Sequence, residues 1–304
     1  MPHSTRTHPW VAMFALACFA PIDAALCQPA LDEPPSSPIA QRQSRFYDFT
    51  EFTLHSADRA RHYSVQIAKP KRLAPVAGYA SVYLLDGNEA VAKLNETLLE
   101  ELNAADPPMI VSIGYADTVR FNVQARAYDY TPPLPAGKPL FDDANRPGGG
   151  ADRFLDLIEE QIKPRVEELT TVDPHRRILW GHSYGGLLTL YAAFTRPNSF
   201  QRFVAASPSL WWNYGAILEH ESAFVTSERR QAMRLDLMVG ELEQQPRSGV
   251  SAMRTSLPPG STRNLADRLK SAGVNVTFTE FPGLGHGPMF EASLTRTLRD
   301  AASL

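Results

Sequence analysis

One short motif constrains this chain more than any other feature of its sequence. An apolar run at 178–180 leads into Gly181-His182-Ser183-Tyr184-Gly185, and a helical pattern follows directly. A Gly-x-Ser-x-Gly turn between a strand and a helix holds its serine on a strained corner with the hydroxyl exposed. A side chain at either outer glycine would collide with neighbouring backbone. The sequence therefore predicts Ser183 as a nucleophile.

A serine hydroxyl is a weak nucleophile until a base accepts its proton, and histidine suits that task near neutral pH. His286 lies between the last predicted strand and the last predicted helix, in Gly285-His286-Gly287. Because α/β-hydrolases carry their triad in the order Ser, acid, His, we expect His286 to be the base. The acid is expected after the strand at 235–239, where Glu241 and Glu243 both qualify. A Ser–His pair without an acid is the alternative.

An oxyanion formed during acyl transfer needs two fixed N–H donors. The backbone of Tyr184, directly after the nucleophile, is expected to supply one. The second is expected from Asp86-Gly87-Asn88, after the predicted strand at 80–85, with Gly87 and Asn88 as candidates. The competing interpretation of this segment is a plain strand-to-helix turn.

Short apolar runs alternate with helical patterns from residue 79 onwards, which indicates βαβ units and a mostly parallel sheet. Strands are expected at 80–85, 109–113, 177–180, 203–206, 235–239 and 274–281, and helices at 89–103, 151–170, 184–194, 261–272 and 288–302. Pro164 should bend or break the helix at 151–170. Strands at 45–54 and 62–68 should pair at the sheet edge. The predicted fold class is α/β: an α/β-hydrolase with a mostly parallel sheet, an antiparallel N-terminal edge and helices on both faces.

The first 27 residues have the layout of a secretory signal peptide. Arg6 precedes an apolar run at 10–20, and small residues lead to Cys27. That run is shorter than the roughly 20 residues needed to cross a bilayer, so no stable membrane span is expected. Both cysteines, Cys18 and Cys27, lie in this segment, and a mature protein without disulfides suits a bacterial periplasm.

A Pro-, Ser- and Gln-rich flexible leader is expected at 28–44, followed by one catalytic domain at 45–304. Within it, 115–150 is rich in Pro, Gly, Arg and Asp, and is longer than structureless loops usually are. We expect a lid there. Lys and Arg together number 30 against 33 Asp and Glu, without basic clusters interleaved with aromatics, which excludes nucleic acid. A small-molecule ester is the expected partner, and neither a cofactor nor a metal is expected.

Several longer blocks are more specific than the serine motif, and with them the sequence resembles the putative-esterase family. That family includes esterase D and the periplasmic ferric-enterobactin and salmochelin esterases. The likeness covers nearly the whole mature chain. Besides the serine motif, it is carried by Leu84-Leu85-Asp86-Gly87-Asn88, Arg126-Ala127-Tyr128-Asp129-Tyr130-Thr131-Pro132, Gly148-Gly149-Gly150, Ser207-Pro208-Ser209-Leu210-Trp211-Trp212-Asn213 and Gly285-His286-Gly287.

The resemblance implies a catecholate siderophore as substrate, with its triserine lactone cut through an acyl-enzyme to release iron. Such ferric complexes are anionic and aromatic, so Arg126, assisted by Arg120, is expected to pair with and stack on the ligand. Trp211 and Trp212 are expected to line the cleft. The alternatives are a general carboxylesterase or thioesterase, an acyltransferase acting on small acyl esters, and a siderophore-binding protein without turnover.

Overall fold

The structure is a computed structural model that describes residue 1 and residues 43–118, 120–135, 140–228, 233–244 and 249–303. The chain divides into two units, Met1–Leu31 and Asp32–Leu304, and the second contains the sheet and its helices. The predicted signal peptide, apart from residue 1, and the leader up to residue 42 lie outside the described residues, so both stay predictions.

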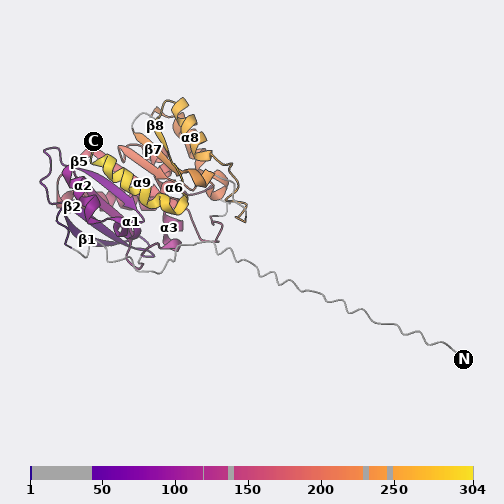
Figure 1. The fold of residues 1–304 in the computed structure, drawn as a ribbon, viewed down its shortest axis with the longest axis horizontal. Helices are drawn as coiled ribbons and strands as arrows, with labels where there is room; N and C mark the ends of the chain where they lie inside the picture. Colours follow the sequence, from indigo (N-terminus) through magenta and orange to yellow (C-terminus); the bar gives the residue numbers. More distant parts are fainter. Residues whose placement is uncertain (2–42, 119, 136–139, 229–232, 245–248, 304) are drawn as a thin grey trace. The chain divides into compact units, whose positions relative to one another are not determined.

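A single sheet forms the centre of this unit, with eight strands in the order β1-β2-β4-β3-β5-β6-β7-β8 (Figure 1). β1 pairs with β2 and β2 with β4 in antiparallel register, and every other neighbouring pair is parallel. The predicted edge hairpin and the mostly parallel sheet are therefore confirmed. The strands are β1 (Tyr47–His55), β2 (His62–Pro70), β3 (Tyr79–Leu85), β4 (Met109–Tyr115), β5 (Val172–His182), β6 (Arg202–Ala206), β7 (Arg234–Gly240) and β8 (Asn275–Phe281).

Helices cover both faces of the sheet because successive strand residues point to opposite sides. In β3, Val82 and Leu84 join one core cluster while Tyr83 and Leu85 join the other. The first cluster is completed by α1 (Gly87–Lys93), α2 (Glu96–Ala104) and α9 (His286–Ala301), which lie together on one face in Figure 1. The second contains side chains from α3 (Val123–Asp129), α4 (Ala151–Leu157), α5 (Lys163–Leu169), α6 (Tyr184–Thr195), α7 (Ile217–Val225) and α8 (Ser261–Ser271). This three-layer arrangement confirms the predicted fold class.

Two predicted helices are interrupted, one as expected and one not. The helix predicted at 89–103 is wrong as a single element, because Asn95 separates α1 from α2 and its side chain accepts a hydrogen bond from the Leu98 amide. This is an N-cap, which starts a new helix. The helix predicted at 151–170 is interrupted, as expected: α4 continues through a π-helical segment at Ile158–Ile162 into α5, where Pro164 stands near the start. A π-helical turn is wider than an α-helical one, so it accommodates Pro164, which has no N–H to donate to the preceding turn.

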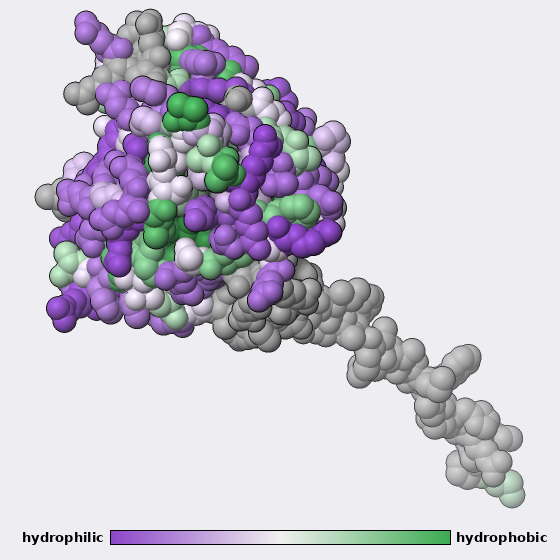
Figure 2. Space-filling view, turned by 90° about the vertical axis from the view of Figure 1, so that its left-hand side faces the viewer, coloured by the Kyte–Doolittle hydropathy of each residue, from purple (hydrophilic) through white to green (hydrophobic). Residues whose placement is uncertain are grey.

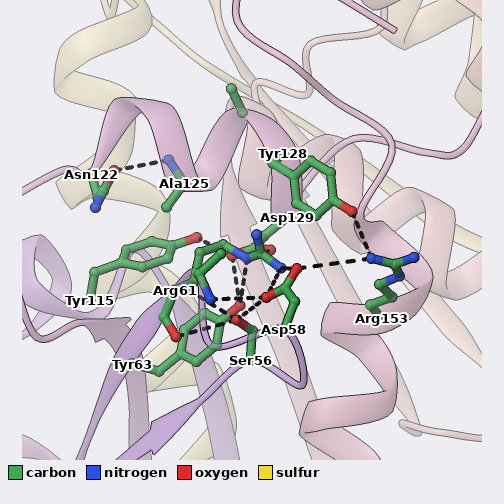
Figure 3. Close-up of polar contacts among 12 residues, drawn as sticks. Ser56, Asp58, Arg61, Tyr63, Tyr115, Asn122, Ala125, Tyr128, Asp129 and Arg153 are labelled. Atoms are coloured by element: carbon green, nitrogen blue, oxygen red, sulfur yellow. Dashed lines mark hydrogen bonds and ion pairs between the residues drawn. The ribbon is translucent and has the colours of Figure 1, made fainter.

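The segment predicted as a lid, 115–150, contains helix α3, which is tied to the sheet. The Asp129 carboxylate, at the end of α3, accepts hydrogen bonds from the hydroxyls of Tyr63 and Tyr115, each at 3.0 Å. Arg61 pairs with the other carboxylate oxygen at 2.9 Å (Figure 3). The next residue, Tyr130, is fully buried. This part of the segment is therefore helical and anchored, and closure over the site stays a prediction.

Hydrophilic residues dominate the face of the molecule seen in Figure 2, and hydrophobic residues form small groups between them. Within the described part of the chain, no helix combines the length and the apolar character that a membrane crossing requires.

Candidate active site

The carboxyl ends of parallel strands meet at one edge of a sheet, and that edge is where open α/β folds bind ligands. Ser183 follows β5, Glu243 lies in a 3-10 turn (Glu241–Gln244) after β7, and His286 opens α9 after β8. The fold thus brings His286 to a carboxylate 43 residues away and to a serine 103 residues away.

Ser183 stands on a strained corner between β5 and α6. Its backbone has φ 61° and ψ −116°, a region that costs a non-glycine residue about 1–3 kcal/mol. The Ser183 amide donates to the carbonyl of Ala206 on β6 at 3.0 Å, which holds the corner against the sheet. A Cβ at Gly181 would lie 2.3 Å from the carbonyl oxygen of Gly185. Glycine is therefore required at Gly181 for this turn to close. The predicted backbone collision at Gly185 is wrong, because a Cβ there would meet nothing closer than the Leu85 side chain at 3.4 Å.

A hydrogen-bond relay joins the three candidate catalytic side chains. His286 Nδ1 lies 2.6 Å from Glu243 Oε2, and His286 Nε2 lies 3.1 Å from Ser183 Oγ. An ionised carboxylate only accepts hydrogen bonds, so the imidazole proton is on Nδ1 and Nε2 is left to accept from the serine hydroxyl. This is the tautomer that a general base needs.

Glu243 is held by more than the histidine. Its Oε1 accepts a hydrogen bond from the Ser207 hydroxyl at 2.6 Å and another from the Gly240 amide at 2.9 Å. Burial raises the pKa of the Glu243 carboxyl, but hydrogen bonds from His286, Ser207 and Gly240 outweigh that effect and bring the pKa below its usual value. The carboxylate therefore stays ionised at neutral pH and fixes the imidazole.

Glu241, the other candidate acid, is directed elsewhere. Its carboxylate accepts a hydrogen bond from the Gly283 amide at 2.8 Å. In the tight turn at Glu241–Gln244, side chains two residues apart point in different directions. The geometry therefore favours Glu243 as the orienting acid, and Glu241 supports the loop that precedes His286.

His182, directly before the nucleophile, is a buried neighbour of the candidate base. Its ring centroid lies 4.6 Å from that of His286. His182 Nε2 donates to the His286 carbonyl oxygen at 2.9 Å, which helps hold the loop. Burial lowers the pKa of His182 well below its usual value, and the nearby His286 and Arg126 act in the same direction. His182 is therefore a neutral ring that packs behind the base.

The predicted oxyanion donors lie on two helix N-termini beside each other. Tyr184 begins α6, while Gly87 and Asn88 begin α1, and the first N–H groups of a helix have no acceptor within it. A Cβ at Gly185 would lie 3.6 Å from Asp86 Oδ2, so the two turns are neighbours. The Asn88 side chain is bound to backbone groups of the 115–118 segment. Its contribution to an oxyanion site is therefore limited to its backbone N–H.

The two arginines predicted to bind substrate are held by carboxylates of the protein. Arg126 makes a two-pronged pair with Asp86, through hydrogen bonds of 2.8 and 2.9 Å, and its side chain is only 13% exposed. Arg120 pairs with Glu89 through hydrogen bonds of 2.6 and 2.7 Å. Arg126 also lies 5.4 Å from the ring of Tyr184. The structure thus places Arg126 beside the serine turn, with most of its charge already neutralised.

The two tryptophans have different positions, although they are adjacent in sequence. Trp211 is partly exposed and lines a cavity that His286 also lines. Trp212 has no exposed surface and belongs to the core, so its predicted place in the cleft is wrong. A sheet-end loop that turns sharply sends neighbouring side chains in opposite directions.

Two further site residues, Ser207 and Ser209, were missed by sequence reasoning. Ser207 holds the Glu243 carboxylate, and the Ser209 hydroxyl lies 3.3 Å from that of Ser183. The signal was the pair of serines in Ser-Pro-Ser immediately after β6. Among the residues that the structure describes, no group of three or more His, Cys, Asp or Glu side chains is placed to hold a metal ion. The arrangement is suited to acyl transfer through a serine ester.

Comparisons with known proteins agree with this chemistry. The family model described as "Putative esterase" matches residues 56–301. The chain is 38% identical over 300 residues to the apo-salmochelin esterase of Escherichia coli O6:H1, covering 98% of this chain and 92% of that protein. It is 34% identical over 261 residues to the ferri-bacillibactin esterase BesA of Bacillus subtilis, covering 82% and 87%. A solved structure of the enterobactin hydrolase IroE in complex with DFP superposes with a TM-score of 0.71 at 37% identity, over 88% of this chain and 99% of that one.

Proposed function

This chain belongs to the putative esterase family, and from that premise we propose that it is a serine esterase that hydrolyses the lactone esters of a catecholate siderophore. The single observation that carries the chemistry is the continuous relay from Ser183 through His286 to Glu243, with contacts of 3.1 and 2.6 Å. We assign these residues the roles of nucleophile, general base and orienting acid.

In the acylation step, Ser183 Oγ attacks the ester carbonyl while His286 Nε2 takes the hydroxyl proton. The carbonyl electron pair moves onto oxygen, and we assign the backbone amide of Tyr184 and those at the start of α1 the role of stabilising this charge. When the carbonyl re-forms, the ester C–O bond breaks and His286 returns the proton to the leaving alcohol. For a seryl lactone, that alcohol is the hydroxyl of the next seryl unit.

Deacylation repeats the sequence with water as the nucleophile. His286 takes a proton from water, the hydroxide adds to the acyl-enzyme, and Ser183 leaves with the proton that His286 returns. In both steps the imidazole becomes positively charged beside Glu243, whose lowered pKa keeps it ionised and able to stabilise that charge.

The substrate assignment rests on the relatives. Two relatives that match most of this chain are named as esterases of salmochelin and bacillibactin. A similar solved structure is named as an enterobactin hydrolase. These siderophores share hydroxylated aromatic groups on a lactone ring, and the iron they carry is cargo rather than a catalytic group. Opening the ring weakens the hold on iron.

Export to the periplasm is also proposed, and the signal-peptide layout at residues 1–27 supports it. An enzyme placed there would meet iron chelates before they reach the cytoplasm.

The proposal is tested by turnover of three substrates: ferric enterobactin, its iron-free form and p-nitrophenyl butyrate. We expect the wild-type protein to open one or both trilactones with a kcat/KM at least a hundredfold above that for the butyrate, as measured by chromatography of the linear products. Ser183→Ala should lose about 10⁶ in kcat while remaining folded. Turnover of the nitrophenyl ester alone would overturn the siderophore assignment. A folded Ser183→Ala variant that keeps several per cent of the activity would overturn the nucleophile.

A further inference from the structure

A cavity of about 380 Å³ opens on the His286 side of the candidate active site. One wall consists of His286, Glu243 and Ser209, the last within 3.3 Å of the nucleophilic hydroxyl. Further lining comes from the segment at 250–262, which runs into the first turn of α8. Ligand pockets span roughly 300–1,000 Å³, so this one lies at the small end of the range and has room for an aromatic group of a substrate.

An arginine stacked on a tryptophan forms the most distinctive part of this cavity. The guanidinium carbon of Arg254 lies 4.2 Å from the centroid of the Trp211 ring. Asp143 accepts hydrogen bonds from Nε and Nη2 of Arg254, and also from the Ser251 hydroxyl at 3.0 Å. The carboxylate therefore fixes the plane of the guanidinium against the ring. Although Asp143 pairs with it, the Arg254 side chain is 41% exposed, against 13% for Arg126, so part of it remains accessible to a ligand.

The rest of the lining is largely apolar. Leu210 follows β6 and Val239 belongs to β7, whereas Leu257, Pro258 and Pro259 come from the segment before α8. An apolar slot bordered by an indole and a cation suits a flat ring that carries negative charge at its edge. An aliphatic acyl group would fill the slot but gain nothing from the charge.

We propose that Trp211 and Arg254 form a subsite that selects an anionic aromatic group on the acyl side of the scissile ester. The inference rests on the proposed function only in placing an ester carbonyl at Ser183. An N-aroylseryl ester fits this geometry, because its aromatic amide is joined to the carbon next to the ester carbonyl. When the ring's hydroxyl groups are ionised in an iron chelate, its edge carries the charge that Arg254 recognises.

Two small esters separate charge from aromaticity: N-benzoylserine methyl ester and its 4-carboxybenzoyl counterpart. We expect Arg254→Gln to reduce kcat/KM for the charged ester about five- to tenfold more than for the uncharged one, since the pair is partly solvated. Arg254→Lys should fall between the wild type and Arg254→Gln. Trp211→Leu should reduce kcat/KM for both esters, because the indole both holds Arg254 and supplies apolar surface to any ring.

Arg263 supplies a matched control on α8. Its guanidinium lies 4.4 Å from the ring of Phe278 and pairs with Glu280 at 3.1 Å, so it repeats the chemistry of Arg254 outside the cavity. Arg263→Gln should leave the ratio of the two esters unchanged.

Equal losses on both esters in Arg254→Gln, or no loss on either, would overturn the subsite. A wild-type preference for an aliphatic acyl ester that Arg254→Gln leaves intact would do the same. Failure to cleave enterobactin, together with an Arg254-dependent preference for the charged ester, would reject the proposed function and leave the subsite standing. Cleavage of enterobactin without that preference would support the proposed function and reject the subsite.

Discussion

Replacing Glu243 with glutamine removes one charge from the candidate site and leaves its size almost unchanged. The substitution has a defined geometric consequence, because Oε1 receives hydrogen bonds from the Ser207 hydroxyl and the Gly240 amide. The Gly240 N–H can only donate, so the oxygen of the new amide must occupy that position. The amide nitrogen then faces His286 Nδ1, which is 2.6 Å from the present Oε2.

That nitrogen donates where the carboxylate accepted, so the proton of His286 moves to Nε2. Nε2–H then points at Ser183 Oγ and cannot accept its proton. Loss of the correct tautomer in a serine triad costs about 10⁴ in kcat. His286 is 39% exposed, so water can reach the ring and recover part of the lost activity. We therefore expect kcat to fall by about 10³- to 10⁴-fold. At 1.36 kcal/mol per factor of ten, this corresponds to roughly 4–5.5 kcal/mol of the activation barrier.

The measurement is steady-state hydrolysis of a nitrophenyl ester, together with the rate of inactivation by diisopropyl fluorophosphate, which reports the nucleophile directly. Both rates should fall in parallel while the melting temperature changes by only a few degrees. Glu241→Gln is the matched control, because its carboxylate binds the Gly283 amide and lies outside the relay. It should stay within about twofold of the wild type. A folded Glu243→Gln enzyme within tenfold of wild-type kcat would refute the role of the acid and leave a Ser–His pair.

Two further predictions concern charges beside the site. Arg126→Ala leaves Asp86 buried without its partner, so the free energy of unfolding measured in urea should fall by about 3–5 kcal/mol. Turnover of neutral as well as anionic esters should weaken. A loss of turnover confined to the siderophore would instead show direct binding by Arg126. Burial raises the pKa of Asp129 from 3.8 to about 7, against the effect of Arg61. The folded protein therefore holds this proton at pH values where the unfolded chain has lost it, so stability contributed by Asp129 falls as pH rises between those two values. Melting curves of Asp129→Asn should show a weaker pH dependence in that window, and an unchanged one would contradict this assignment.

The fold was largely predictable because most strands and helices of the catalytic unit have strong local patterns. The parallel strands are short apolar runs in the sequence, and α8 and α9 are amphipathic stretches. The predictions that failed concerned elements whose bounds depend on a single capping residue or on partners far away in the sequence. Asn95 followed by Glu96 carries an N-cap signal that a continuous apolar pattern concealed. Helix α3 is only two turns long and is fixed by Arg61 and Tyr63, more than 60 residues away in the chain.

The residues of the candidate site also fall into two groups, those located by a local motif and those that depend on distant contacts. Ser183 and His286 lie in motifs whose backbone geometry is local, so sequence alone locates them. The choice between Glu241 and Glu243 depends on the direction of side chains in one 3-10 turn, which residue type does not encode. The pairing of Arg126 with Asp86 spans 40 residues and joins two different loops. Sequence spacing could suggest that each is near the site, but not that they neutralise each other.

The loop after β6 contacts both ends of the relay from Ser183 through His286 to Glu243. Ser207 adopts a positive φ of 45°, which is unusual for a serine and turns the chain sharply at the end of the strand. From this turn, the Ser207 hydroxyl holds Glu243, and two residues later Ser209 contacts Ser183 through both its backbone amide and its hydroxyl. One short loop therefore sets the positions of both ends of the relay. Because His286 must bridge the two, a shift of this loop would lengthen both of its hydrogen bonds together.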